Sequence, residues 1–95
     1  MITVCVRKDG IEIHGHAGYA ENGKDIVCAG VTALVQGLIR SVESLTSDKI
    51  KYDISPGRVD IHCRDLSETG MLLVDSFFIG VCSIADEFPD YVRIE

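Results

Sequence analysis

The sequence predicts an α+β domain with two helices packed on one face of a mainly antiparallel sheet. Two pairs of alternating apolar and polar segments predict two β-hairpins, and two longer segments with apolar residues three or four positions apart predict helices. A short alternating segment near the end adds a fifth strand, so the order is ββαββαβ. The 95 residues suffice for one compact domain, 1–95, in which an active site lies near the surface or at a subunit interface.

The first predicted hairpin joins alternating segments at residues 2–7 and 11–14. The Asp-Gly pair at 9–10 is a hairpin turn signal, and we expect it to form a two-residue loop. The residues then expected to pair are Lys8 with Ile11, Arg7 with Glu12, Val6 with Ile13 and Cys5 with His14. In this register the isoleucines of the second strand face the core, whereas His14 and His16 face the opposite, wetter side.

A polar, glycine-containing segment follows at 17–24, and we expect a mobile surface loop there. Asp25 has the character of a helix N-cap, because its carboxylate can accept from amides of the first turn, which puts Cys28 at about position N3. The helix should run for about five turns and end at 46–48. Its apolar stripe is Val27, Val31, Leu34, Val35, Leu38, Val42 and Leu45. Gly30 weakens this helix relative to alanine and leaves room for a close approach of backbone or substrate.

The second predicted hairpin joins alternating segments at 50–54 and 59–63. Between them, the sequence Ser-Pro-Gly-Arg at 55–58 is a turn signal. Proline followed by glycine favours a turn of type I or II over the primed types that two-residue hairpin loops prefer.

A second helix is predicted to begin at Ser67 and Glu68, which suit a helix start. Its apolar stripe is Met71, Val74, Phe77, Phe78, Val81, Cys82, Ala85 and Phe88. Pro89 ends the helix because proline cannot continue its hydrogen bonding, and residues 91–94 then form a short last strand.

Composition and charge argue against several classes of function. The chain is 46% hydrophobic, has 6% aromatic residues and no tryptophan, and carries a net charge of −6 with a pI near 4.9. Nucleic-acid binding needs a basic surface, so we expect no direct contact with nucleic acid. No uninterrupted apolar run approaches the roughly 18 residues of a membrane span, and no secretory signal opens the sequence. We therefore expect a cytoplasmic protein without membrane contact.

Two residues form the strongest candidate for chemistry. Cys28 lies at a predicted helix N-terminus, where backbone amides and the helix dipole stabilise a thiolate. His16 lies at a strand end beside the loop, so its imidazole can take the thiol proton and later protonate a leaving amine. Cys5 opposite His14 is a rival thiol–imidazole pair that lacks a helix terminus. Without a secretory signal, we expect all cysteines to be free thiols.

Each candidate also has an alternative without chemistry. Cys28 can be a buried structural thiol, and His16 an ordinary surface histidine. Asp25 is first of all a helix cap, with polarisation of His16 or positioning of the first turn as an added role. Thr32, one turn beyond Cys28, either hydrogen-bonds near the site or back-bonds to the Cys28 carbonyl.

A metal site is a weaker interpretation. His14 and His16 have the spacing of a zinc-binding pair, which His62 or Cys63 could join. No residue supplies a clear fourth ligand, so we expect neither a metal nor another cofactor. Cys63 and Cys82 fit positions that face the core.

The residues around the two candidates carry a family resemblance. They are His16-Ala17, then Gly23-Lys24-Asp25-Ile26-Val27-Cys28-Ala29-Gly30-Val31-Thr32-Ala33-Leu34, then Ser41-Val42-Glu43, with Phe77-Phe78-Ile79-Gly80 in the second helix. These segments closely resemble the ribosomal-processing cysteine protease Prp family of bacteria. The resemblance extends over the whole chain, including the ββαββαβ order.

The resemblance implies a small cytosolic endopeptidase, usually homodimeric, that removes an N-terminal extension from the twenty-seventh protein of the large ribosomal subunit and so supports ribosome assembly. It makes Cys28 the nucleophile and His16 the general base, with Asp25 and Thr32 in a supporting shell. Thr32 stands where the family usually has serine, which keeps the hydroxyl but adds a methyl group. The family's cleavage segment is extended, apolar and contains phenylalanine, so it needs a hydrophobic groove. We also expect oxyanion donors among the first-turn amides, including that of Cys28.

Two functions of other classes stay open from the sequence. One is a non-catalytic, ribosome-associated interaction module in which Cys28 is a structural or redox-sensitive thiol. The other is a zinc-binding domain, which would bind metal stoichiometrically and unfold with a chelator.

Overall fold

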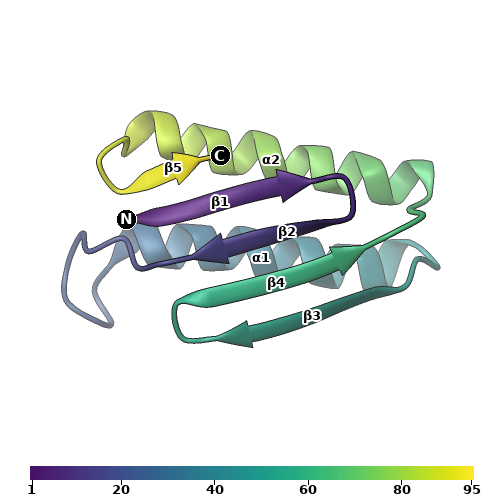
Figure 1. Ribbon diagram of the computed structural model, residues 1–95, viewed down its shortest axis with the longest axis horizontal. Helices are drawn as coiled ribbons and strands as arrows, with labels where there is room; N and C mark the ends of the chain where they lie inside the picture. Colours follow the sequence, from purple (N-terminus) through teal and green to yellow (C-terminus); the bar gives the residue numbers. More distant parts are fainter.

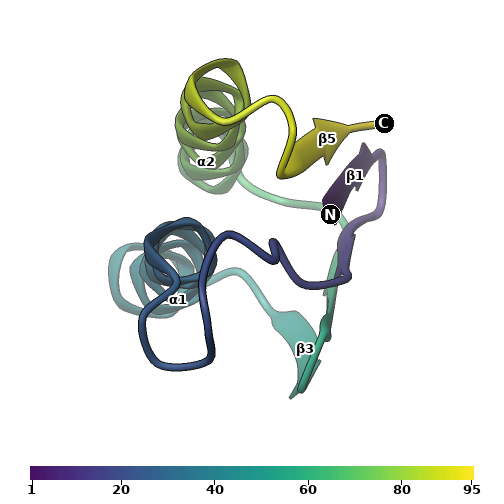
Figure 2. The same cartoon turned by 90° about the vertical axis from the view of Figure 1, so that its left-hand side faces the viewer.

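In the computed structural model, which describes all 95 residues, five strands form one sheet and two helices cover one of its faces (Figure 1 and Figure 2). The elements are β1 (Ile2–Arg7), β2 (Gly10–His14), α1 (Ile26–Leu45), β3 (Ile50–Ser55), β4 (Arg58–Cys63), α2 (Glu68–Glu87) and β5 (Val92–Ile94). The strand order is β3-β4-β2-β1-β5, and every pair is antiparallel except β1 and β5. The predicted α+β class and the ββαββαβ order are confirmed.

The hydrophobic core lies between the sheet and the two helices, with α2 nearer β5 and α1 nearer β3 (Figure 2). Its most deeply buried side chains, each at most 1% exposed, are Val4, Ile11, Val27, Val42 and Val81. Val27 belongs to the first turn of α1, so the start of this helix is fixed by core packing as well as by its cap. This rigid start is the part of the fold that positions the candidate site.

The first hairpin turns one residue earlier than expected. Residues 8–9 form the loop and Arg7 pairs with Gly10, so the predicted loop at 9–10 and its register are wrong. Gly10 is a strand residue that lies against β4, where an added Cβ would be 2.5 Å from the Ile61 carbonyl oxygen. A glycine is therefore needed at this position because β2 and β4 approach closely here, and not because of the turn. Because the register differs by two residues, each strand residue still faces the expected side of the sheet.

The second hairpin turns at Pro56 and Gly57, with Ser55 paired to Arg58. Gly57 has a φ of 74°, which suits the third position of a type II turn. The fixed negative φ of proline excludes the primed types, which need a positive φ at the second position. The turn therefore agrees with the type expected from its Pro-Gly sequence.

Both helices begin at their predicted caps. The Asp25 carboxylate accepts hydrogen bonds from the amides of Val27 and Cys28, each at 3.0 Å. The Ser67 hydroxyl accepts one from the Gly70 amide at 3.1 Å. Cys28 is therefore at position N3, as predicted.

The two helices approach each other closely at glycines. An added Cβ at Gly30 would lie 3.3 Å from the Ile84 side chain, and one at Gly80 would lie 3.1 Å from that of Leu34. The space that Gly30 leaves is therefore filled by α2, not by a substrate.

Both helices are long and apolar enough to cross a membrane by length and composition alone, although 33% of the α1 window and 17% of the α2 window are buried in this fold. Uninterrupted apolar runs in both helices are shorter, because polar residues such as Gln36 and Arg40 in α1 and Asp75 in α2 interrupt them. Helices of a packed core meet the same criterion, so it is weak evidence for a membrane. The low burial of α2 nevertheless leaves much of its apolar surface without a partner.

Candidate active site

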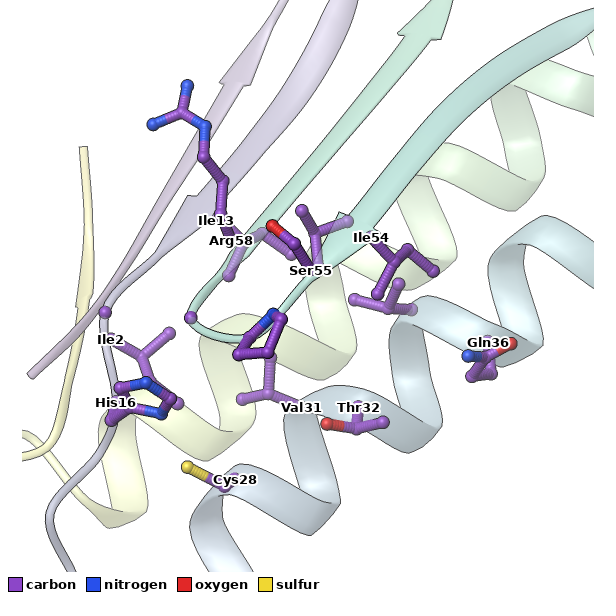
Figure 3. A pocket seen from close by; sticks show the side chains of 15 residues that line it. Ile2, Ile13, His16, Cys28, Val31, Thr32, Gln36, Ile54, Ser55 and Arg58 are labelled. Carbon is purple, nitrogen blue, oxygen red and sulfur yellow. The ribbon is translucent and has the colours of Figure 1, made fainter.

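Cys28 lies in the first turn of α1, and its sulfur points into a cavity at one end of the sheet (Figure 3). Val27, buried in the core, and the Asp25 cap together fix the backbone of this turn. The side chain of Cys28 is only partly buried, so its sulfur reaches the cavity. The dipole and amides of a helix N-terminus favour the anionic form of a sulfur in this position.

One backbone amide donates directly to the sulfur. The N–H of Ala17 donates to Cys28 Sγ at 3.4 Å, and Ala17 itself is buried. A hydrogen bond of this kind strengthens when its acceptor is charged, so it stabilises the thiolate. Sequence reasoning missed this contact, because an alanine side chain carries no sign of what its backbone amide does.

His16 enters the same cavity from the end of the sheet (Figure 3). β2 ends at His14, and Gly15 has a φ of 96°, which breaks the alternation of the strand. His16 therefore turns toward α1 instead of sharing the outer face with His14, and the predicted side was wrong. The turn is held by a hydrogen bond from the Gly15 amide to the Gly57 carbonyl at 2.9 Å.

Two hollows meet at this pair of residues. One, of about 240 Å³, lies between α1 and the β3–β4 turn, and the other, of about 1030 Å³, lies against the loop before α1. Cys28, His16, Thr32 and Pro56 line both of them. The apolar lining of the smaller hollow consists of Ile2, Ile13, Val31, Val35, Ile54, Pro56 and Val59. Together the hollows provide room for an extended chain that passes over the sulfur.

The Asp25 carboxylate binds backbone amides, and it makes no hydrogen bond to His16. One oxygen accepts from the first turn of α1, and the other accepts from the amides of Tyr19 at 3.0 Å and Ala20 at 3.4 Å. These hydrogen bonds, that of the Cys28 amide above all, lower the pKa of Asp25 against a smaller opposing effect of desolvation. Of its two proposed added roles, the geometry fits positioning of the first turn, and it also ties the loop to the helix.

The amide of Cys28 is not free to stabilise an oxyanion. It donates to Asp25 at 3.0 Å, so its predicted place among the oxyanion donors is wrong for this structure. The cap that fixes the first turn of α1 therefore takes up this amide. The amide of Ala17, by contrast, points at the sulfur of Cys28.

Thr32 lies one turn along α1 from Cys28 and lines both hollows (Figure 3). Of its two expected roles, the back-bond to the Cys28 carbonyl does not form, and the exposed hydroxyl makes no hydrogen bond within the protein. Its oxygen is therefore available to a molecule in the groove.

The rival thiol–imidazole pair does not form. The observed register places Cys5 opposite Glu12 and His14 opposite Thr3. Cys5 is buried, and its sulfur accepts a hydrogen bond from the Arg7 guanidinium at 3.4 Å. A sulfur covered in this way has no space for a substrate.

The remaining thiols and histidines form no second site. Cys63 faces the core, and burial, with a smaller effect of the Asp9 charge, raises the pKa of its thiol. Cys82 is partly buried on α2, and all four cysteines are free thiols. No group of three or more histidine, cysteine, aspartate or glutamate side chains is arranged to hold a metal ion. His14 and His16 face different sides of the sheet, because Gly15 turns the chain between them.

Comparison with known proteins finds relatives along the whole chain. The family model for cysteine protease Prp matches residues 1–93. The ribosomal processing cysteine proteases Prp of Staphylococcus aureus and Bacillus subtilis are each 31% identical to this chain, over 103 and 110 residues. The matches cover 99% of this chain and 97% and 96% of those two proteins.

Solved structures share the fold. A crystal structure of the ribosomal processing protease Prp from S. aureus with a covalently linked product peptide matches with a TM-score of 0.93 and 27% identity. The match covers 100% of this chain and 98% of that chain. A crystal structure of the S. aureus protease with a substrate peptide matches with a TM-score of 0.83 over 99% and 95% of the two chains, at 23% identity.

Proposed function

We propose that this chain, which belongs to the Prp family of cysteine proteases, cleaves a ribosomal protein with Cys28 as nucleophile and His16 as general base. One observation carries the assignment of these residues. Both line the cavity at the N-terminus of α1, where the Ala17 amide donates to the Cys28 sulfur at 3.4 Å. Asp25 and Thr32 support the site from the helix that bears the nucleophile.

The reaction follows from these positions. His16 takes the thiol proton, and the thiolate of Cys28 attacks the carbonyl carbon of the scissile peptide bond. The imidazolium then protonates the departing amine, which leaves a thioester between Cys28 and the N-terminal part of the substrate. Water, deprotonated by His16, hydrolyses the thioester and restores the thiol. The helix terminus and the Ala17 amide lower the cost of the thiolate at the start of the cycle.

The groove fits an extended peptide with large apolar side chains beside the scissile bond. The hollow of about 240 Å³ is lined by aliphatic side chains, which favours phenylalanine or a similar residue. β3 is an edge strand whose end, at Ile54 and Ser55, borders this hollow. Its free backbone groups support pairing with an extended substrate. The S. aureus relative, crystallised with substrate and covalently linked product peptides, supports a peptide in the corresponding place.

The substrate that we propose is the N-terminal extension of the twenty-seventh protein of the large ribosomal subunit, processed in the cytoplasm as part of ribosome assembly. The names of the relatives, which specify ribosomal processing, support this choice. The net charge of −6 disfavours direct contact with ribosomal RNA, so recognition rests on the protein extension alone.

The test is to incubate the purified enzyme with the ribosomal protein carrying its extension and to follow the product by mass spectrometry. We expect one cleavage, which removes the extension and leaves the mature ribosomal protein. Cys28→Ala should abolish cleavage while circular dichroism shows the same fold, and His16→Ala should reduce it greatly. A ribosomal protein made without the extension is the matched control and should stay intact.

Two results would overturn the proposal. Cleavage by folded Cys28→Ala at the parent rate would remove the nucleophile assignment. No cleavage by the wild-type enzyme, with the same ribosomal protein bound tightly, would favour the non-catalytic interaction module instead.

We further propose that the enzyme is a homodimer whose interface includes the outer face of α2. Leu72 and Ile79, seven residues apart on one face of this helix, are 68% and 70% exposed, and Met71 and Phe78 lie beside them at 50% and 37%. An apolar patch of this kind, left uncovered by its own chain, is typical of an interface. A second copy of the chain can cover it by two-fold symmetry.

Light scattering after size-exclusion chromatography tests the dimer. Wild type should have twice the mass of one chain, and Leu72→Glu with Ile79→Glu should shift it to the monomer. Lys51→Glu, an exposed charge change on β3, is the control and should leave the mass unchanged. A wild-type monomer at all concentrations, or a dimeric double variant, would contradict this interface.

A further inference from the structure

The imidazole of His16 lacks the carboxylate partner that orients the base in many nucleophilic enzymes. No side chain hydrogen-bonds to its ring, and Asp25 directs both carboxylate oxygens at backbone amides. His16 is also exposed, so core packing does not hold the ring on every side. A different feature of the fold must therefore restrict its orientation.

The β3–β4 turn supplies this restriction through Gly57. An added Cβ at this glycine would lie 2.8 Å from His16 Nε2 and 3.4 Å from both carbons that flank this nitrogen. The bare backbone of the turn is therefore in contact with the end of the imidazole. The Gly57 carbonyl also accepts from the amide of Gly15, the residue before His16, at 2.9 Å. One residue thus contacts the ring and holds the backbone that carries it.

We infer that Gly57 is a positioning residue for His16. Its bare backbone keeps the imidazole facing Cys28, a task that a carboxylate performs in a catalytic triad. The inference rests on the proposed function, because it takes His16 as the base. A β-carbon at position 57 occupies space that the imidazole needs. Because the ring is exposed, it can yield by rotating away, and the fold stays intact while the pair with Cys28 is lost.

The experiment measures how fast iodoacetamide alkylates Cys28 as a function of pH, which needs no substrate. The peptide 25–40, released by trypsin, reports Cys28 separately from the other three cysteines. Gly57→Ala and Gly57→Asn both add the Cβ, and asparagine tolerates a positive φ better than alanine. Gly23→Ala and Gly23→Asn are matched controls, because Gly23 has a φ of 88° and open space around its Cα.

We expect both Gly57 variants to lose the imidazolium that stabilises the thiolate. Their alkylation midpoint should move toward that of His16→Ala, and alkylation on the acid side should be about tenfold slower than in the wild type. The two Gly23 variants should keep the wild-type midpoint. In the cleavage assay, the Gly57 variants should lose kcat.

The outcomes separate this inference from the proposed function. If His16→Ala does not shift the midpoint, the thiol and imidazole are uncoupled, and the proposed catalytic pair fails along with its positioning residue. If His16→Ala shifts the midpoint but the Gly57 variants have the same midpoint as the Gly23 variants, the Cys28–His16 pair is supported and the role of Gly57 is refuted. Thermal unfolding of each variant identifies any that fails to fold. If Gly57→Ala does not fold, Gly57→Asn remains the test.

Discussion

At the scale of single residues, the site depends on how the backbone around Cys28 and His16 is held. The position of Cys28 in the first turn of α1 could be predicted because an aspartate followed by a hydrophobic helix start is a recognisable cap. The side of the sheet to which His16 points could not, because strand alternation was extended past Gly15, whose positive φ ends it. No feature of the sequence indicated the hydrogen bond from the Ala17 amide to the Cys28 sulfur, because nearly every residue carries the same backbone amide.

The hydroxyl of Thr32 gives a prediction at this scale. It has no partner within the protein and lines the groove, so we expect it to hydrogen-bond the bound peptide. Thr32→Val should lower kcat/KM by roughly fivefold, the value of a neutral hydrogen bond of about 1 kcal/mol. Thr32→Ser keeps the hydroxyl and is the control, with nearly wild-type kcat/KM. Equal values for the valine and serine variants would show that the hydroxyl has no such role.

At the scale of elements, the strands, helices and caps were predictable because local periodicity and a few terminal residues determine them. The loop of the first hairpin was not. An Asp-Gly pair is a strong turn signal, yet Gly10 is required by the nearby Ile61 carbonyl on β4, which is distant in the sequence. The same limit applies to the loop before α1, because its aromatic contacts involve Phe88 and Tyr91 near the other end of the chain.

Tyr19 anchors this loop to the end of α2. Its ring makes edge-to-face contacts with Phe88, at 5.5 Å between centroids, and Tyr91, at 5.2 Å. Each such pair is worth about 0.5 to 1.5 kcal/mol, so Tyr19→Ala should speed amide hydrogen exchange of residues 18–24 by about tenfold. Tyr52→Ala removes an exposed tyrosine from β3 and should leave that exchange unchanged. Unaltered loop exchange in Tyr19→Ala would mean that the rings do not anchor it.

The rest of the loop is expected to order on binding. Gly18 and Gly23 have positive φ and open space around them, and the segment buries little of its surface. A substrate peptide bound to Cys28→Ala should therefore slow exchange in residues 20–24. Exchange as fast with the peptide as without it would reject this prediction.

Two carboxylates make the helix starts sensitive to acid: Asp25, the N-cap of α1, and Asp48, which accepts from the amide and hydroxyl of Ser67, the N-cap of α2. Hydrogen bonds from the Cys28 amide lower the pKa of Asp25, and those from Ser67 lower the pKa of Asp48, in each case below the usual 3.8. Both groups bind their partners as carboxylates, so they stabilise the fold fully above pH of about 4 to 5 and lose this effect as pH falls through the lowered pKa. Urea unfolding between about pH 6 and pH 2.5 should show stability falling on the acid side. Asp25→Asn and Asp48→Asn, which do not titrate, should each flatten the fall, and an unchanged slope in both would contradict the linkage.

At the scale of the whole molecule, the α+β class was predictable and the arrangement of the sheet was not. β5 runs parallel to β1 at one edge, and β4 inserts between β3 and β2. β1 and β5, and likewise β2 and β4, are far apart in the sequence, so no local pattern specifies these pairings. The arrangement matters for function because it brings the β3–β4 turn to the end of β2 (Figure 1). There the Gly57 backbone contacts the His16 ring, and its carbonyl accepts from the Gly15 amide.

The most direct measurement of the central claim is the mass of Cys28 during turnover. Wild-type enzyme and His16→Ala, mixed with the extended ribosomal protein and quenched in acid, should carry the acyl part of the substrate as a thioester on peptide 25–40. Loss of the general base should slow hydrolysis as well as attack. Cleavage that proceeds with no adduct on Cys28, and that persists in folded Cys28→Ala, would contradict a reaction through this sulfur.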